Sequence, residues 1–137
     1  MYTKAKSIED LISKSPYQEV MEKVDEMVSS NTNLERHYFD NGKTFSAISY
    51  GRIGDLGRKN YAYADAGVIN INTQKNFVGL YIWVNGGDGK IIEKYADQLP
   101  KSAMGKGCIN IKNIEFLNKY EDIIKQVILD VDKITIH

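Results

Sequence analysis

The residues most capable of chemistry in this chain are its only cysteine, Cys108, and its two histidines, His37 and His137. A thiol becomes a nucleophile when a nearby base or positive charge lowers its pKa. Neither histidine stands at a motif spacing from Cys108, and a lone cysteine at the start of a strand is usually a small packing residue. The residues therefore favour a domain without enzymatic activity. A thiol-dependent enzyme that uses Cys108 is an alternative.

Acidic residues near the N-terminus form a second candidate site. On a helix, Glu19, Glu22 and Glu26 fall on one face, and Asp25 lies beside them. Carboxylates spaced in this way could hold a hard cation or iron at the surface. The same spacing also suits the solvated side of an amphipathic helix. An iron or metal chaperone is thus a further alternative. No other cofactor is expected, and one Cys and two His do not make a zinc site of Cys/His pairs.

Three Gly-Lys steps raise the question of a phosphate-binding loop, which requires the pattern G-x-x-x-x-G-K-[ST]. Before Gly42-Lys43-Thr44, the position of the first glycine is taken by His37. Gly89-Lys90 is followed by Ile91, which cannot bind magnesium. The segment 105–107 leads into a predicted strand and so lacks the helix dipole that favours an anion. The sequence excludes a P-loop.

Composition excludes several other classes. The 18 Lys+Arg balance the 18 Asp+Glu, so there is no overall attraction to nucleic acid or to an anionic membrane. The aromatic strands lack an RNP-like pattern, and one cysteine forbids an internal disulfide. No stretch approaches the roughly 18 apolar residues that span a bilayer, and residues 1–15 lack the apolar core of a signal peptide. We expect a cytoplasmic protein that binds neither nucleic acid nor membrane.

A chain of 137 residues predicts a single domain over 1–137. The first third is predicted to be helical, with a short helix over 7–13. A second helix is predicted to start with Ser15 as its cap and Pro16 as its first residue. The apolar stripe of this second helix consists of Val20, Met21, Val24, Met27 and Val28.

The middle of the chain is predicted to form short antiparallel strands, because its segments are β-branched or aromatic and bounded by turns. The predicted strands are 45–50, 61–66, 68–73, 77–84 and 108–112. A Gly-rich loop, 51–60, joins the first two. Helices are predicted over about 90–99 and 118–132, with a short strand or a frayed end over 133–137. The predicted class is α+β: N-terminal helices, a mostly antiparallel sheet of four to five strands with helices packed on one face, and a C-terminal amphipathic helix.

The alternation of side chains along these strands predicts two different sheet faces. One is aliphatic and suits the helices. The other would gather a mixed aromatic and amide set: Tyr61, Tyr63, Asn70, Asn72, Tyr81, Trp83, Cys108 and Asn110. Such a face could bind a small ligand, form a homodimer interface, or lie under the 51–60 loop. The leading hypothesis is a non-enzymatic domain that binds a small molecule or self-associates through this face.

The C-terminal half resembles the YdhG-like family, also known as domain of unknown function 1801. The resemblance rests on TQKNFVGLYIW (73–83), on MGKGCINIKNIEFLN (104–118) and on the helix EDIIKQVI (121–128). The step Ser49-Tyr50-Gly51 is similar to the one that opens the family's sheet, and the resemblance covers about residues 17–131.

The chain departs from the family pattern at two places. Arg52 and Ile53 stand where the family commonly has Met-Pro, and Asn110 stands where it has tyrosine. The resemblance implies a compact α+β domain with no established catalytic activity. Because some relatives are described as frataxin-like iron chaperones, it also implies a use for the acidic helix face.

Overall fold

The structure is a computed structural model that describes residues 2–56, 63–83, 90–105 and 107–135. Its α-helices are α1 (Ile8–Lys14), α2 (Gln18–Asn31), α3 (Lys90–Glu93), α4 (Ile114–Lys119) and α5 (Glu121–Thr135). Its strands are β1 (Arg36–Asp40), β2 (Ser46–Tyr50), β3 (Ile69–Thr73), β4 (Val78–Ile82), β5 (Met104–Gly105) and β6 (Cys108–Ile111). Short 3-10 turns are η1 (Ile53–Leu56), η3 (Ala96–Gln98) and η4 (Lys101–Ala103).

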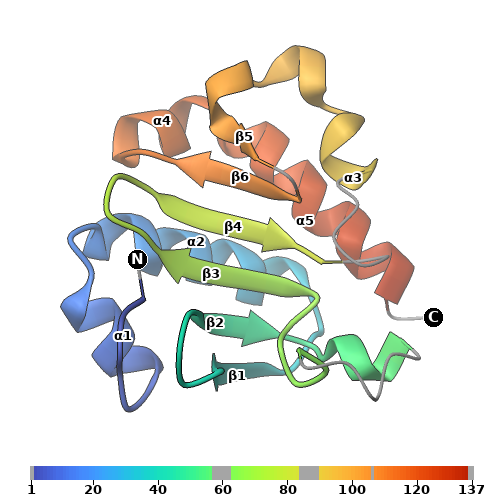
Figure 1. Cartoon of the computed structure of the whole chain (residues 1–137). Helices are drawn as coiled ribbons and strands as arrows, with labels where there is room; N and C mark the ends of the chain where they lie inside the picture. Colours follow the sequence, from blue (N-terminus) through green and yellow to red (C-terminus); the bar gives the residue numbers. More distant parts are fainter. Residues whose placement is uncertain (1, 57–62, 84–89, 106, 136–137) are drawn as a thin grey trace.

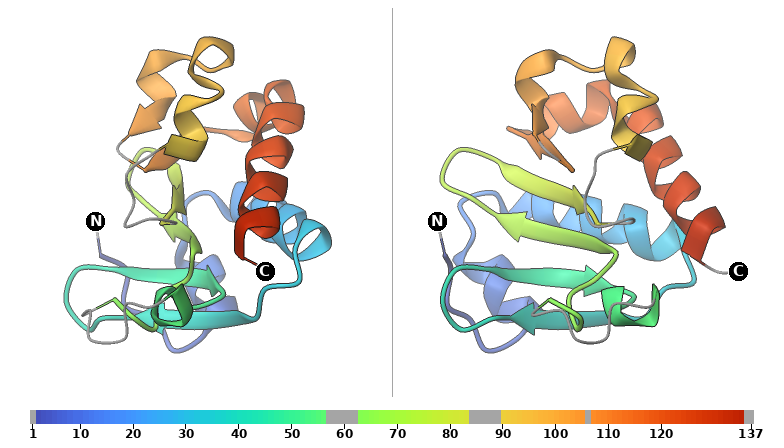
Figure 2. Two further views of the ribbon diagram at one scale, coloured as in Figure 1. Left: turned by 90° about the vertical axis from the view of Figure 1, so that its right-hand side faces the viewer. Right: turned by 45° about the vertical axis from the view of Figure 1, so that its right-hand side comes forward.

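The six strands form one antiparallel sheet in the order β1-β2-β3-β4-β6-β5. Helices α2 and α5 lie side by side behind this sheet, and α1 packs near β2 on the same side (Figures 1 and 2). The segment from α3 to η4 lies above β6 and reaches α5. The α+β class, the antiparallel sheet and the C-terminal helix are confirmed.

A row of four aliphatic residues crosses the helix-facing side of the sheet. Ile48 is the register partner of Ile71, Ile71 of Leu80, and Leu80 of Ile109. All four are fully buried and belong to the same core cluster as the buried residues of α2 and α5. Because burying one such side chain contributes about 1.5–3 kcal/mol, this row fixes which face of the sheet the helices cover. The aliphatic face predicted from strand alternation is confirmed.

The start of α2 differs from the prediction. Its first residue is Gln18 and its cap is Tyr17, whose side chain makes no capping hydrogen bond. The Ser15 hydroxyl instead accepts a bond from the Tyr17 amide at 2.9 Å and lies 2.6 Å from the hydroxyl of Thr73 in β3. The Ser15 hydroxyl therefore links the α1–α2 junction to the sheet and does not cap the helix. Pro16 lies in the turn before the helix.

Strand β1 was not predicted, since its pattern of polar and aromatic residues resembles a loop; pairing with β2 stabilises it as an edge strand. Conversely, the strand predicted over 61–66 is wrong for its described residues, 63–66, which form a turn and a bend. The carbonyl groups of Ala64 and Ala66 accept bonds from Gly54 and Ile53 in η1, at 2.8 and 2.9 Å. These backbone groups are used to hold η1 and do not extend the sheet.

The C-terminal half also contains more breaks than predicted. The helix expected over 90–99 is a short α3 followed by η3. The last helix is divided at Tyr120, and α4 begins at Ile114 because the Asn113 side chain accepts a bond from the Phe116 amide. Helix α5 continues to Thr135, so the alternative of a terminal strand over 133–137 is wrong for 133–135. No helix in the described ranges is long and apolar enough to cross a membrane.

Candidate functional site: a cleft beside β6

The sheet face opposite the helices, called the outer face below, carries an aromatic cluster. Its members are Phe39, Phe45, Tyr63, Tyr81 and Trp83. The rings of Phe45 and Trp83 lie 5.1 Å apart, and those of Phe45 and Tyr81 lie 5.5 Å apart and nearly perpendicular. Tyr63, Tyr81 and Trp83 are half-buried. The structure thus brings three of the predicted site residues together, while Tyr61 lies outside the described residues.

The two predicted site asparagines of β3 have structural roles. Asn70 is fully buried; its oxygen accepts bonds from the Ser49 hydroxyl at 2.6 Å and the Gly67 amide at 2.9 Å. Its amide nitrogen donates to the Gly67 carbonyl at 2.7 Å. Asn72 is also buried, donates to the Ser46 carbonyl at 2.7 Å and accepts a bond from Gln74. These two side-chain amides, with their hydrogen bonds made inside the protein, hold β2 against β3 and fix the turn at Gly67 that precedes β3. They present no free group to a ligand.

Cys108 lies on the outer face at the start of β6 with 7% of its surface exposed, and its thiol is 3.4 Å from the side-chain oxygen of Asn110. Burial raises the pKa of the Cys108 thiol, which is the opposite of what a nucleophile requires. His37 lies on β1, at the other end of the strand order, where its ring bonds the Asp65 carbonyl at 2.7 Å. The structure therefore separates Cys108 from His37, and His137 lies outside the described residues.

The structure does not bring the four acidic residues of α2 together as one group of metal ligands. Glu19, Glu22 and Glu26 are exposed, whereas Asp25 forms two bonds with Arg36, at 2.6 and 3.0 Å, and a further bond with the Tyr50 hydroxyl. Arg36 neutralises this carboxylate, and the bonds occupy its oxygens. Within the described ranges, no group of three or more His, Cys, Asp or Glu residues is placed to hold a metal ion.

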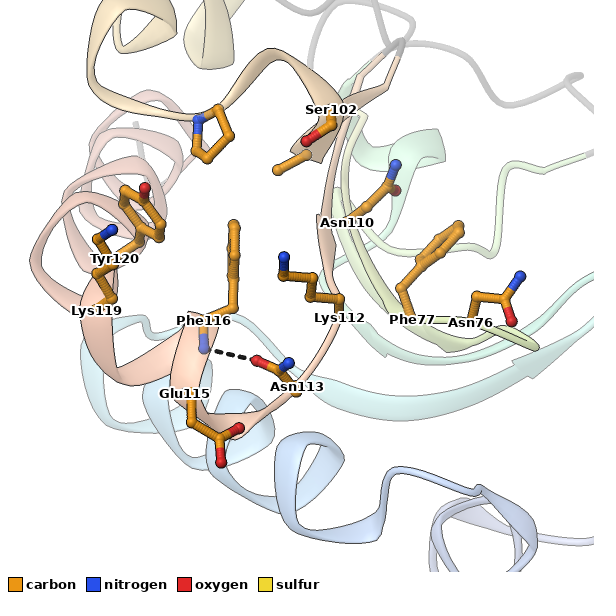
Figure 3. Close-up of a pocket in the computed structure, with 12 residues that line it drawn as sticks. Asn76, Phe77, Ser102, Asn110, Lys112, Asn113, Glu115, Phe116, Lys119 and Tyr120 are labelled. Carbon is orange, nitrogen blue, oxygen red and sulfur yellow. Dashed lines mark hydrogen bonds between the residues drawn. The ribbon is translucent and has the colours of Figure 1, made fainter.

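A cleft of about 490 Å³ opens where the outer face meets the C-terminal helices (Figure 3). Its walls are the turn before β4, the end of β6 with the residues that follow it, η4 and α4. Its lining consists of Asn76, Phe77, Pro100, Ser102, Ala103, Asn110, Lys112, Asn113, Glu115, Phe116, Lys119 and Tyr120. Of the residues predicted from the sequence, only Asn110 belongs to this lining.

Aromatic rings dominate the apolar part of the cleft. The ring centres of Phe116 and Tyr120 lie 4.7 Å apart, with an angle of 44° between the ring planes. Figure 3 shows the Phe116 ring directed into the middle of the cleft, with Tyr120 and Phe77 on opposite sides. Asn113 fixes this arrangement because its side chain caps α4 through the Phe116 amide at 2.8 Å. The cleft therefore offers flat surfaces on which a planar molecule can stack.

The charge of the lining is positive: two lysines, Lys112 and Lys119, against one carboxylate, Glu115. The Lys119 ammonium lies 5.4 Å from the centre of the Tyr120 ring. Lys112 is exposed, and its side chain is directed into the cleft (Figure 3). No carboxylate of the described residues pairs with Lys112. The arrangement can attract an anionic group to an aromatic-lined hollow.

The chain matches no family model, no curated protein and no solved structure. Membership of the YdhG-like family therefore stays a prediction based on the quoted motifs. The sequence did contain one signal for the cleft, since Phe77 and Asn110 fall on the outer face by strand alternation. The other walls come from separate segments, and only the packing of η4 and α4 brings them to this point.

Proposed function

We propose that the protein is a cytoplasmic, non-enzymatic domain that binds a small molecule in the cleft beside β6. The observation that carries this proposal is the cleft itself, about 490 Å³ in volume and lined by three aromatic rings, amides and two lysines. Clefts that bind small molecules typically measure about 300–1,000 Å³ and combine apolar walls with a few polar groups. The buried thiol of Cys108, with its raised pKa, favours binding over thiol chemistry.

A titration followed by ¹⁵N-¹H NMR tests this function, with 2-naphthoate and its neutral amide as probes. Saturable shifts are expected at the backbone amides of Lys112, Asn113 and Phe116, which line the cleft. Ser102→Trp places a bulky ring at the exposed rim and should abolish these shifts. Ser13→Trp, on the exposed surface of α1, is the matched control and should leave them unchanged. Shifts that are scattered over the protein, or that survive Ser102→Trp, would contradict the cleft as the binding site.

A second candidate function is self-association through the aromatic cluster. Tyr63, Tyr81 and Trp83 are half-buried on the outer face, whereas α2 and α5 pack on the opposite face (Figure 2). Aromatic residues are enriched in the contacts between subunits. Sedimentation equilibrium should then detect a dimer that Trp83→Lys dissociates. A wild-type protein that remains monomeric at all loading concentrations rules this candidate out.

A further inference from the structure

We infer that the ligand of the cleft is an aromatic carboxylate, with its ring beside Phe116 and its carboxylate on Lys112. This inference rests on the proposed function and deepens it by naming a ligand class. It follows from three features of the lining: where the rings stand, which positive charge is unpaired, and which hydrogen-bond donors are still available.

The aromatic walls select a flat molecule. Phe77 directly precedes β4, whereas Phe116 lies on α4 and Tyr120 at its end, so the rings reach the cleft from two sides. Phe116 is held from two directions, by its contact with Tyr120 at 4.7 Å and by the cap bond of Asn113. A ring held in this way loses little freedom when a ligand stacks on it, which favours binding.

Lys112 supplies the charge. Three lysines elsewhere in the described residues form ion pairs at 2.9–3.0 Å: Lys14 with Asp10, Lys23 with Glu121 and Lys94 with Asp130. No such pair among the described residues involves Lys112, whose side chain enters the cleft (Figure 3). With Lys119 also positive and Glu115 negative, the lining carries one net positive charge, 2 − 1 = +1. This balance suits a ligand with a single negative charge.

The remaining donors favour a carboxylate over a phosphate. Phosphate sites commonly use arginine or several free backbone amides, but the cleft has no arginine, and the Phe116 amide is occupied by Asn113. The side-chain oxygen of Asn110 accepts a hydrogen bond from the Cys108 thiol. The NH₂ group of Asn110 is therefore the end of the side chain that a ligand can bind. An ammonium and one amide NH₂ match the two oxygens of a carboxylate.

Calorimetric titrations of the whole chain with matched pairs of acids and amides test this inference. The probes are benzoate with benzamide, 2-naphthoate with 2-naphthamide, and AMP as a phosphate-bearing aromatic. At least one of the two acids should bind about tenfold more tightly than its own amide, since a hydrogen bond to a charged group has about this effect. Lys112→Gln should remove this preference and leave amide binding unchanged. Lys43→Gln, an exposed lysine of the β1–β2 hairpin, should have no effect.

Each outcome separates the ligand class from the proposed function. If acids and amides bind equally, or if Lys112→Gln keeps the preference, the carboxylate inference is overturned and the binding function stands. If AMP binds more tightly than either acid, the ligand class is a nucleotide, which also overturns the inference. If none of the probes binds, both the proposed function and the inference fail. Thermal unfolding of each variant verifies that it is folded.

Discussion

The ring of Tyr81 lies over Gly79, two residues earlier on the same face of β4. A β-carbon at position 79 would come 2.6 Å from Cε2 of that ring, closer than atoms in contact allow. The ring has little room to move away because it packs against Phe45 and Trp83, at 5.5 and 5.6 Å. The absence of a side chain at position 79 thus sets the position of Tyr81, and through it the aromatic cluster.

Gly79→Ala is expected to destabilise the protein by about 1–3 kcal/mol, since extra volume at a packed site forces its neighbours to shift. Trp83 is the only tryptophan, so its fluorescence and near-ultraviolet circular dichroism should change together with the unfolding midpoint. In a Tyr81→Ala background the same substitution should cost much less, because the ring is gone. An equal cost in both backgrounds would show that Tyr81 is not the group displaced.

Asp25 joins three elements, because it binds Arg36 of β1 and the hydroxyl of Tyr50 at the end of β2 while lying on α2. Tyr50 is 1% exposed, and its hydroxyl also donates to the Asp25 carbonyl at 3.0 Å. Tyr50→Phe should therefore reduce the free energy of unfolding by about 1–2 kcal/mol, as measured by urea denaturation. Tyr17→Phe is the control, since its hydroxyl makes a single exposed bond to the Lys75 carbonyl; a similar loss there would contradict a special role for Tyr50.

Asp130 is expected to make stability depend on acid pH. Desolvation, the largest influence, raises the pKa of this carboxyl, but hydrogen bonds from Tyr95 at 2.6 Å and Lys94 at 3.0 Å outweigh it and lower the pKa overall. A lowered pKa in the folded state means that the unfolded chain binds the proton more readily. The contribution is therefore present above the unfolded pKa of about 3.9 and is lost as pH falls through the folded pKa.

Urea denaturation at pH 6 and at pH 3 measures this effect. Asp130→Asn should lose on the order of 1 kcal/mol at pH 6 and differ less from the wild type at pH 3, because that pH lies below the unfolded pKa of about 3.9, where part of the contribution is already lost. Asp97→Asn changes an exposed carboxyl of η3 and serves as the control. A deficit of Asp130→Asn that is the same at both pH values would refute the linkage.

Cys108 should react slowly with thiol reagents in the folded protein. It is 7% exposed, and burial raises its pKa, so both access and the thiolate fraction are reduced. With a disulfide reagent at pH 8, labelling should be at least about tenfold slower than in urea-unfolded protein, because it depends on opening of the structure. Faster labelling in the native protein, or a reactivity midpoint below pH 8.5, would restore a thiol-dependent function.

The amino-acid order alone dictates which side chains share a face of the sheet. Successive side chains of a strand point to opposite faces, so Ile109 and Ile111 were bound to oppose Cys108 and Asn110 once the segment was a strand. The same geometry placed Tyr81 and Trp83 together on the outer face. Such local periodicity survives in any arrangement of the neighbouring elements.

The role of each face depends on how the strands and helices pack together. Strand β1 exists because β2 supplies its hydrogen-bond partners, and Asn70 became a structural residue because Ser49 and Gly67 meet it. The cleft needs Phe77, Lys112 and Phe116 at one point, although nothing in their separate segments encodes that meeting. A binding site depends on distances between distant parts of the chain, and those distances are set by how the sheet and the helices pack.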